Sequence, residues 1–327
     1  MFKIFSLLLM KSSILVGGQA VIEGVMMRVP GAYATAVRLK DQSIKVQRHN
    51  FHSIIEKHNM KKFIIIRGMI HLYESMKMGY QTLDWSANMQ EEEQKQLSTP
   101  TFFSKIQDTI LSLFSVAFAI TLFFYLPLFF THYIEGIINQ PFLFNIFSGI
   151  IRITIFLLYL ILISQLKDVK RLFQYHGAEH KVVYNFESGE KLNLENATKF
   201  STKHPRCGTS FVFILMLVTI LTYSITDSCI SIIFDYNFSI ITRILIHLLF
   251  LPLIAGIGYE VLKFLSTKQH ILFFRLLSKP GLWLQNITTS EPTPNQLEVS
   301  LTALKTAFGD QYIRSFEGKQ FNADAMG

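Results

Sequence analysis

Cysteine and charged residues are both scarce in this chain of 327 residues. Its two cysteines, Cys207 and Cys229, cannot build the disulfide framework of a small secreted protein, so Cys207 is free to bind a metal and Cys229 is expected to be a small buried residue. Charged residues make up only 17% of the sequence, whereas half of the residues are hydrophobic. This composition is too apolar for an ordinary soluble domain of this length, and it indicates a membrane protein.

Four stretches carry almost no charge and are long enough to cross a bilayer as helices, which takes roughly 17 to 25 residues. They are residues 109–134, 142–166, 209–226 and 236–259. We therefore predict a polytopic α-helical membrane protein with four transmembrane helices in two hairpins. Arg152 and Arg243 interrupt the second stretch of each pair, and we expect both to mark the outer interface rather than a path for ions or substrate. His247 is expected to be a hydrogen-bonded core histidine.

Lysine and arginine are distributed unevenly around these stretches. The chain has 31 of them, and all except Arg152 and Arg243 lie before the first stretch, in the connector 167–208, or after the fourth stretch. Basic segments stay on the cytoplasmic side of a membrane, so we expect both termini and the connector to be cytoplasmic. The same basic loops account for the net charge of +8, which therefore predicts no specific nucleic-acid partner. It favours a weak attraction to anionic lipid or to ribosomal RNA.

The stretches divide the chain into five predicted parts. Residues 1–104 form a small cytoplasmic α+β module with an amphipathic helix, and residues 105–166 form the first transmembrane hairpin. Residues 167–208 are a cytoplasmic connector rich in His and Cys, residues 209–262 form the second hairpin, and residues 263–327 form a cytoplasmic tail with a capped amphipathic helix.

Local patterns predict the elements of the amino-terminal module. Residues 34–39 and 44–48 are β-prone on either side of a polar pair, which predicts a hairpin, and Gly17-Gly18 and Pro30-Gly31 predict turns. Residues 64–87 carry apolar side chains at three- and four-residue steps, so we expect a helix whose stripe packs on the module or lies against the membrane surface. The stripe consists of Met69, Tyr73, Met76, Tyr80 and Leu83.

The tail carries a helix-capping pattern. Thr293 stands at the cap, Pro294 at the first helical position and Gln296 three residues after the cap. A single apolar stripe follows, made of Leu297, Leu301, Leu304 and Phe308. We therefore expect a helix that docks on the rest of the cytoplasmic part.

The connector contains two short clusters of metal-binding side chains. His176 and His180 are four residues apart and share one face of a helix, and His204 and Cys207 follow in the same connector. Together they supply four nitrogen and sulfur ligands of the kind that zinc prefers. The sequence therefore predicts a zinc site made of these four residues, just beneath the membrane.

Glu179 stands between the two histidines in the order of an inverted zincin motif, in which a Glu takes the proton from the attacking water. Four protein ligands would close the shell and make the zinc structural, whereas three would leave a position for water, whose pKa falls to about 7 on zinc. Glu260 is an alternative third ligand, although we expect it, like Asp168, to be an interfacial acid. Glu187 is expected to be solvated.

Four segments resemble the YqhQ-like family of bacterial membrane proteins. Their sequences are GGQAVIEGVMMR (17–28), FQYHGAEHK (173–181), HPRCGTSF (204–211) and PGLWLQ (280–285) with TT (288–289). The resemblance implies a multi-pass protein of the bacterial inner membrane, in a family of unknown function described as predicted metal-dependent enzymes on the same His, Glu and Cys residues. It also draws attention to Glu23 and Arg28, which can bind a substrate group or, alternatively, form a buried ion pair.

These observations leave three functional hypotheses. The leading one is a zinc-dependent hydrolase, with Glu179 as base, that acts at the cytoplasmic membrane surface on a lipid or a membrane peptide. The alternative is a non-enzymatic factor in which a structural zinc clips the connector and the basic face docks a ribosome, a translocon or another membrane protein. The third hypothesis is transport through the paired hairpins. Only Arg152 and Arg243 support it, and with four spans per chain it would require oligomers.

Overall fold

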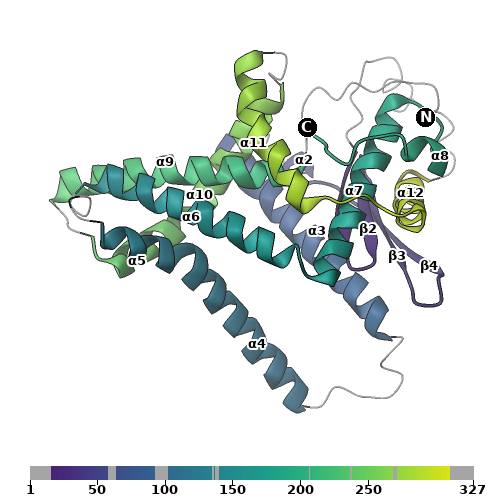
Figure 1. The fold of residues 1–327 in the computed structure, drawn as a ribbon, viewed down its shortest axis with the longest axis horizontal. Coiled ribbons are helices and arrows are strands. Elements are labelled where there is room, and N and C mark those ends of the chain that lie inside the picture. The colour runs from purple at the N-terminus through teal and green to yellow at the C-terminus, as the bar shows by residue number, and fades with distance from the viewer. Residues whose placement is uncertain are drawn as a thin grey trace.

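The structure is a computed structural model that describes residues 16–57, 64–92, 102–134, 136, 140–205, 207–235, 238–267 and 271–309. Long helices form a bundle, and a small four-stranded sheet with its covering helices lies at one end of that bundle (Figure 1). The prediction of a mainly helical protein with a small α+β module is therefore confirmed.

The sheet is an antiparallel meander with the strand order β1-β2-β3-β4. Its strands are β1 (Gly17–Val21), β2 (Gly24–Val29), β3 (Ala32–Arg38) and β4 (Ile44–Asn50). The predicted hairpin of β3 and β4 and the turn at Pro30-Gly31 are confirmed, with Gly31 at φ 84°. The turn predicted at Gly17-Gly18 is wrong, because both glycines lie in β1 and the chain reverses at Ile22-Glu23, where Glu23 adopts φ 53°.

Helices cover both faces of this sheet. On one face α7 (Lys167–Ser188) and α12 (Pro294–Phe308) bury the main core, to which α8 (Leu194–Ala197) adds Ala197. The predicted cap of α12 is confirmed as a reciprocal capping box of Thr293 and Gln296, and its predicted apolar stripe is buried against the sheet. The sheet therefore serves as the platform on which α7 is held.

The other face of the sheet packs on α3 (Ile64–Glu92), which follows the short helix α2 (Ile54–Lys57). The predicted helix is confirmed, but its predicted stripe does not pack on the module: Tyr73, Met76 and Tyr80 are all exposed. The contact is made from the opposite side of the helix, for example by Met78 and Gly79. Met78 is buried there and the large ring of Trp85 packs beside it, so the side of the helix that carries the tyrosines is turned away from the sheet.

Within the described residues, four helical segments are long and apolar enough to cross a membrane. The first, Thr109–His132, comprises most of α4 (Phe102–Ile120), a π-helical turn η2 (Thr121–Tyr125) and α5 (Leu126–His132). The others lie in α6 (Pro141–Ile163), α9 (Gly208–Phe234) and α10 (Ile240–Thr267). In Figure 1, α6, α9 and α10 run side by side, whereas α4 diverges from them below η2.

The third of these segments is longer than the sequence predicted. We expected it to end at residue 226, but α9 continues to Phe234, so Asp227 lies inside the helix with no exposed surface. The carboxylate of Asp227 pairs with Arg243 at 3.1 Å and accepts hydrogen bonds from Asn145 and from His247. The interpretation of His247 as a hydrogen-bonded core histidine is thus confirmed. Arg243 lies in the first turn of α10, and its charge is satisfied by the carboxylate of the neighbouring α9.

The structure also shows the surroundings of Arg152 and Cys229. Arg152 donates from Nε to the carbonyl oxygen of Phe123 in η2, at 2.8 Å. Cys229, which we expected to be buried, is exposed on the outer side of α9. A cysteine is small and only weakly polar, so it can stand on the exposed side of an apolar helix as well as in a core.

At the end of the bundle where the sheet lies, α3 crosses α10 closely, because Gly68 and Gly256 bring the two backbones together. A Cβ added to Gly68 would lie 2.5 Å from the carbonyl oxygen of Gly256. Arg67 and Glu260 form a two-pronged ion pair at the same crossing. The crossing ties the amino-terminal module to the last apolar helix.

Candidate metal centre

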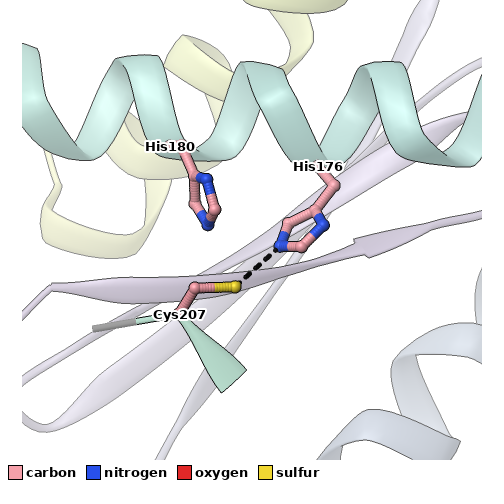
Figure 2. A group of neighbouring side chains, drawn as sticks. All are labelled: His176, His180 and Cys207. Atoms are coloured by element: carbon pink, nitrogen blue, oxygen red, sulfur yellow. Dashed lines mark hydrogen bonds between the residues drawn. The ribbon is translucent and has the colours of Figure 1, made fainter. Parts of the chain in front are cut away.

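Two helices bring three metal-binding side chains together. His176 and His180 project from one face of α7, and Cys207 stands at the cap that begins α9 (Figure 2). Nitrogen atoms of the two rings and the sulfur of Cys207 all lie within 4.8 Å of one another. The sulfur is 3.2 Å from Nε2 of His176. We call these three residues the His–Cys trio.

The ring orientation of both histidines is set by backbone carbonyls. Nδ1 of His176 lies 2.8 Å from the carbonyl oxygen of Thr288, and Nδ1 of His180 lies 2.5 Å from that of Thr202. A carbonyl oxygen can only accept, so each Nδ1 carries the proton and each Nε2 keeps its lone pair. This arrangement of a histidine whose far nitrogen is held by a carbonyl is the usual support for a metal ligand.

Cys207 is held at the amino-terminal end of α9, where Thr209 donates to its sulfur from both the backbone and the hydroxyl group, the latter at 3.2 Å. Hydrogen bonds and the positive end of a helix both stabilise a negatively charged sulfur. The side chain is also buried. Cys207 therefore has the surroundings that a thiolate ligand requires.

His204 lies beside the trio but is not part of it. Its ring centroid is 5.7 Å from that of His180, and its Nε2 faces a carboxylate oxygen of Glu187 at 3.4 Å. Burial lowers the pKa of His204 to about 4, because the charged ring would lose its hydration, although the nearby Glu179 carboxylate opposes this. Burial also lowers the pKa of His180, against a hydrogen bond with Cys207. Both rings are therefore neutral at pH 7.

Glu179 is buried one position before His180, with a carboxylate oxygen 3.4 Å from the Nε2 of that ring. Gly18 of β1 makes room for it, since a Cβ there would lie 2.7 Å from Cγ of Glu179. A cavity of about 110 Å³ opens at this point. Its walls are Val16, Gly17, Gly18, His176, Glu179, His180, Val183, His204, Cys207 and Gly208. The cavity thus joins the trio, a carboxylate and the first strand of the sheet.

The other acidic and basic candidates lie elsewhere. Glu23 forms a two-pronged ion pair with Arg171 of α7, and Arg28 stacks on the ring of Phe51. Glu260 pairs with Arg67, as described above, and Asp168 is exposed in the first turn of α7. None of these four acidic and basic candidates lines the cavity.

The sequence did not point to several groups that support the trio. Gln285 of α11 (Leu272–Thr288) holds the backbone of His204 from both sides: its Oε1 accepts from the N–H and its Nε2 donates to the carbonyl, both at 2.8 Å. The carbonyls of Thr202 and Thr288 orient the two rings. Glu187, which we expected to be solvated, is largely buried against His204. Backbone carbonyls leave no trace in a sequence, but Gln285 and Thr288 do belong to a motif that carried the family resemblance.

Most of the chain matches a known protein family and a known relative. The family described as "Protein of unknown function (DUF1385)" matches residues 64–310. The uncharacterized protein YqhQ of Bacillus subtilis (strain 168) is 30% identical over 301 residues, which span 87% of this chain and 89% of that protein. No solved structure matches. The resemblance inferred from the four motifs is confirmed, and the chain belongs to the DUF1385 family of proteins of unknown function.

Proposed function

We propose that this protein is a membrane-anchored zinc hydrolase whose active site is the cavity beside the His–Cys trio. The observation that carries the proposal is the convergence of two imidazole nitrogens and one sulfur, each with its lone pair directed inward and its other polar contacts already made. His176, His180 and Cys207 would hold the ion. Two nitrogens and one sulfur are a donor set that suits zinc, and catalytic zinc sites commonly have three protein ligands.

The chemistry proposed for the chain itself centres on Glu179. Zinc, when bound, supplies a Lewis acid that makes a water molecule acidic near neutral pH. The Glu179 carboxylate lies beside His180 and lines the same cavity, so it can accept a proton from a water molecule there and return it to a leaving group. Gly17 lines the cavity without a side chain, and even a Cβ there would meet no other atom within 4 Å, which leaves room for a substrate.

The proposed location is the cytoplasmic surface of the inner membrane. Elements that flank the four apolar helices, namely α3, α7 and α12, lie together at one end of the bundle (Figure 1). Because the basic segments of the chain are found in these flanking parts, the positive-inside rule favours the cytoplasm for that end. A hydrolase held there would act on a lipid or on a peptide that is itself bound to the membrane.

A second candidate function is a structural zinc in a non-enzymatic assembly factor. The proximity of His204 to His180 favours it, since His204 could serve as a fourth ligand and exclude water. X-ray absorption at the zinc edge distinguishes the two: three nitrogen and one sulfur ligands support the structural site, whereas two nitrogens, one sulfur and one oxygen support the hydrolase.

The decisive experiment on the hydrolase uses purified, zinc-loaded protein in nanodiscs, tested against quenched fluorescent peptides and fluorescent phospholipids. We expect Glu179→Gln to lower the rate by about 10²–10⁴-fold while zinc is retained, because the proton acceptor is lost and the ligands are not. Glu195→Gln, which changes an exposed carboxylate of α8, is the matched control and should leave the rate unchanged. Equal rates for Glu179→Gln and the unaltered protein would contradict the proposal.

A further inference from the structure

Helix α11 has two unlike faces. Leu272, Leu276, Lys279 and Trp283 follow one another at steps of four, three and four residues, so they share one side of the helix. All four are exposed, and Phe273 lies next to them. The exposed fractions of the four apolar side chains are between 47% and 65%. We call Leu272, Phe273, Leu276 and Trp283 the outer face of α11.

The opposite face builds the metal centre. Gly281 and Leu284 are buried, Gln285 holds the backbone of His204, and the carbonyl oxygen of Thr288 orients His176. A helix turns by about 100° per residue, which places Gln285 and Thr288 roughly 140–200° around the axis from Trp283. The same short helix therefore presents large apolar side chains outward and supports two members of the candidate site inward.

The direction of α11 is unlike that of the apolar helices. It follows α10 and packs on α9, the helix that begins at Cys207. In Figure 1 it rises steeply from the end of α9, at the end of the bundle where the sheet and α7 lie. A helix that crosses transmembrane helices steeply at their end runs along the plane of the bilayer, in the interfacial region.

We propose that the outer face of α11 lies in the cytoplasmic interface of a phospholipid bilayer, and that this contact holds the inner face against the metal centre. Tryptophan and leucine are the side chains that such interfaces favour, and a lysine among them can extend its ammonium group to lipid phosphates. The inference rests on the membrane location given above, but it does not require that the site be catalytic.

One consequence is that lipid contact supports zinc binding. The outer face has no ligand on it, yet a shift of α11 would move Gln285 and Thr288 and thereby the loop that leads to Cys207. Groups that support metal ligands typically contribute 10–100-fold to affinity, so an indirect loss through α11 should be smaller, about two- to tenfold.

The chain has two tryptophans, which makes the lipid contact measurable. Trp283 is on the outer face, whereas Trp85 packs beside the cluster formed by the sheet and α3. Full-length protein is placed in nanodiscs of ordinary or brominated phosphatidylcholine, with bromine near the headgroup end of the acyl chains. Trp85→Phe reports Trp283 alone, and Trp283→Phe reports Trp85 alone.

We expect brominated lipid to quench the fluorescence of Trp283 at least twofold and to leave that of Trp85 nearly unchanged, since bromine quenches only at short range. Equal quenching of the two, or none of Trp283, would overturn the proposal. The unaltered protein serves if either variant folds poorly, because its emission should then be quenched down to the contribution of Trp85. A hydrolysis assay that fails leaves this result untouched.

The link to the metal is tested with Leu272→Gln/Leu276→Gln in the same nanodiscs. Its zinc dissociation constant, measured by competition with a chelating dye, should rise by about two- to tenfold. Val46→Gln removes a partly exposed apolar side chain from β4 and is the matched control. An unchanged constant for the double variant would overturn the coupling between lipid contact and zinc.

Discussion

The two ends of α9 carry two buried polar clusters that differ in kind. Cys207 caps the start of the helix, and Asp227 follows 20 residues later, or about 30 Å along the axis. At Asp227 the charges are complementary, because the carboxylate meets the guanidinium of Arg243 and accepts from Asn145 and His247. At Cys207 two ring nitrogens and a sulfur meet, and all three are electron-pair donors.

This difference separates a cluster that is complete from one that requires a cation. The Asp227 cluster satisfies its own charges, so it can stabilise the packing of α6, α9 and α10 without any ligand. In the His–Cys trio the only proton between the three atoms is that of the Cys207 thiol, which can be donated to the Nε2 atom of one histidine. The Nε2 atom of the other histidine then has its lone pair directed at atoms that also carry lone pairs. A metal ion resolves this conflict, and four predictions test the contrast.

The largest effect is expected at the trio. Cys207→Ala removes one of three ligands, so zinc affinity should fall by more than the roughly 10–100-fold that loss of a supporting group costs. Elemental analysis of purified protein and competition with a chelating dye measure the change. Cys229→Ala is the matched control, since it removes the exposed cysteine of the same helix, and it should keep its zinc. Equal zinc content in both variants would remove the basis for the metal centre.

At the other end, Asp227→Ala should weaken the fold and spare the metal. It leaves the guanidinium of Arg243 buried without its partner, which costs about 3–5 kcal/mol in unfolding free energy. Unfolding in mixed detergent micelles measures the change. Asp227→Ala/Arg243→Leu should recover most of the stability, because no charge is then left alone. Loss of zinc from Asp227→Ala under native conditions would show that the two clusters are not independent.

The pH dependence of the metal-free protein tests the burial of His204. Its pKa is about 4 in the folded protein and about 6.5 in an unfolded chain, so the unfolded state binds the proton first as the pH falls. Stability should therefore be complete above pH 6.5, fall between pH 6.5 and 4 by at most about 3 kcal/mol, and lose nothing further from this group below pH 4. His204→Gln should flatten this part of a melting-temperature profile. If the melting temperature of His204→Gln changed with pH as steeply as that of the unaltered protein, the His204 ring would have to be exposed to water in the folded state.

The smallest effect is expected from Gln285→Leu. This variant keeps all three metal ligands but releases the peptide of His204, which lies between Thr202 and Cys207. We expect zinc affinity to fall by about 10–100-fold, as for other supporting groups. Asn286→Leu changes the exposed neighbour and controls for the added apolar side chain. A normal affinity in Gln285→Leu would show that the loop is held by other contacts.

Features that depend on a few neighbouring residues could be predicted from the sequence. The cap of α12 needs only Thr293, Pro294 and Gln296, and the structure has that cap. The shared face of His176 and His180 follows from their spacing alone, because any α-helix brings residues four apart together. The apolar helices followed in the same way from the length of the uncharged runs.

Features that depend on a distant partner could not be predicted in this way. Asp227 looks like the start of a loop until Arg243 and His247 of the next helix are placed beside it. Gly17 and Gly18 resemble a turn, yet both lie in a strand that pairs with β2, and Gly18 leaves the space that Glu179, more than 150 residues later, occupies. The stripe of α3 is apolar, but Met78, Trp85 and Met89 on its other side are the residues that pack on the sheet.

The sequence by itself determined which segments are apolar helices and which side chains can bind a metal, since composition and helical spacing are local properties. Tertiary structure decided which of those side chains meet and how they are oriented. The carbonyl that orients His176 belongs to a residue 112 positions later, and the carboxylate beside Arg243 comes from another helix. Such contacts exist only after packing, because burial and distance belong to the whole chain rather than to any stretch of it.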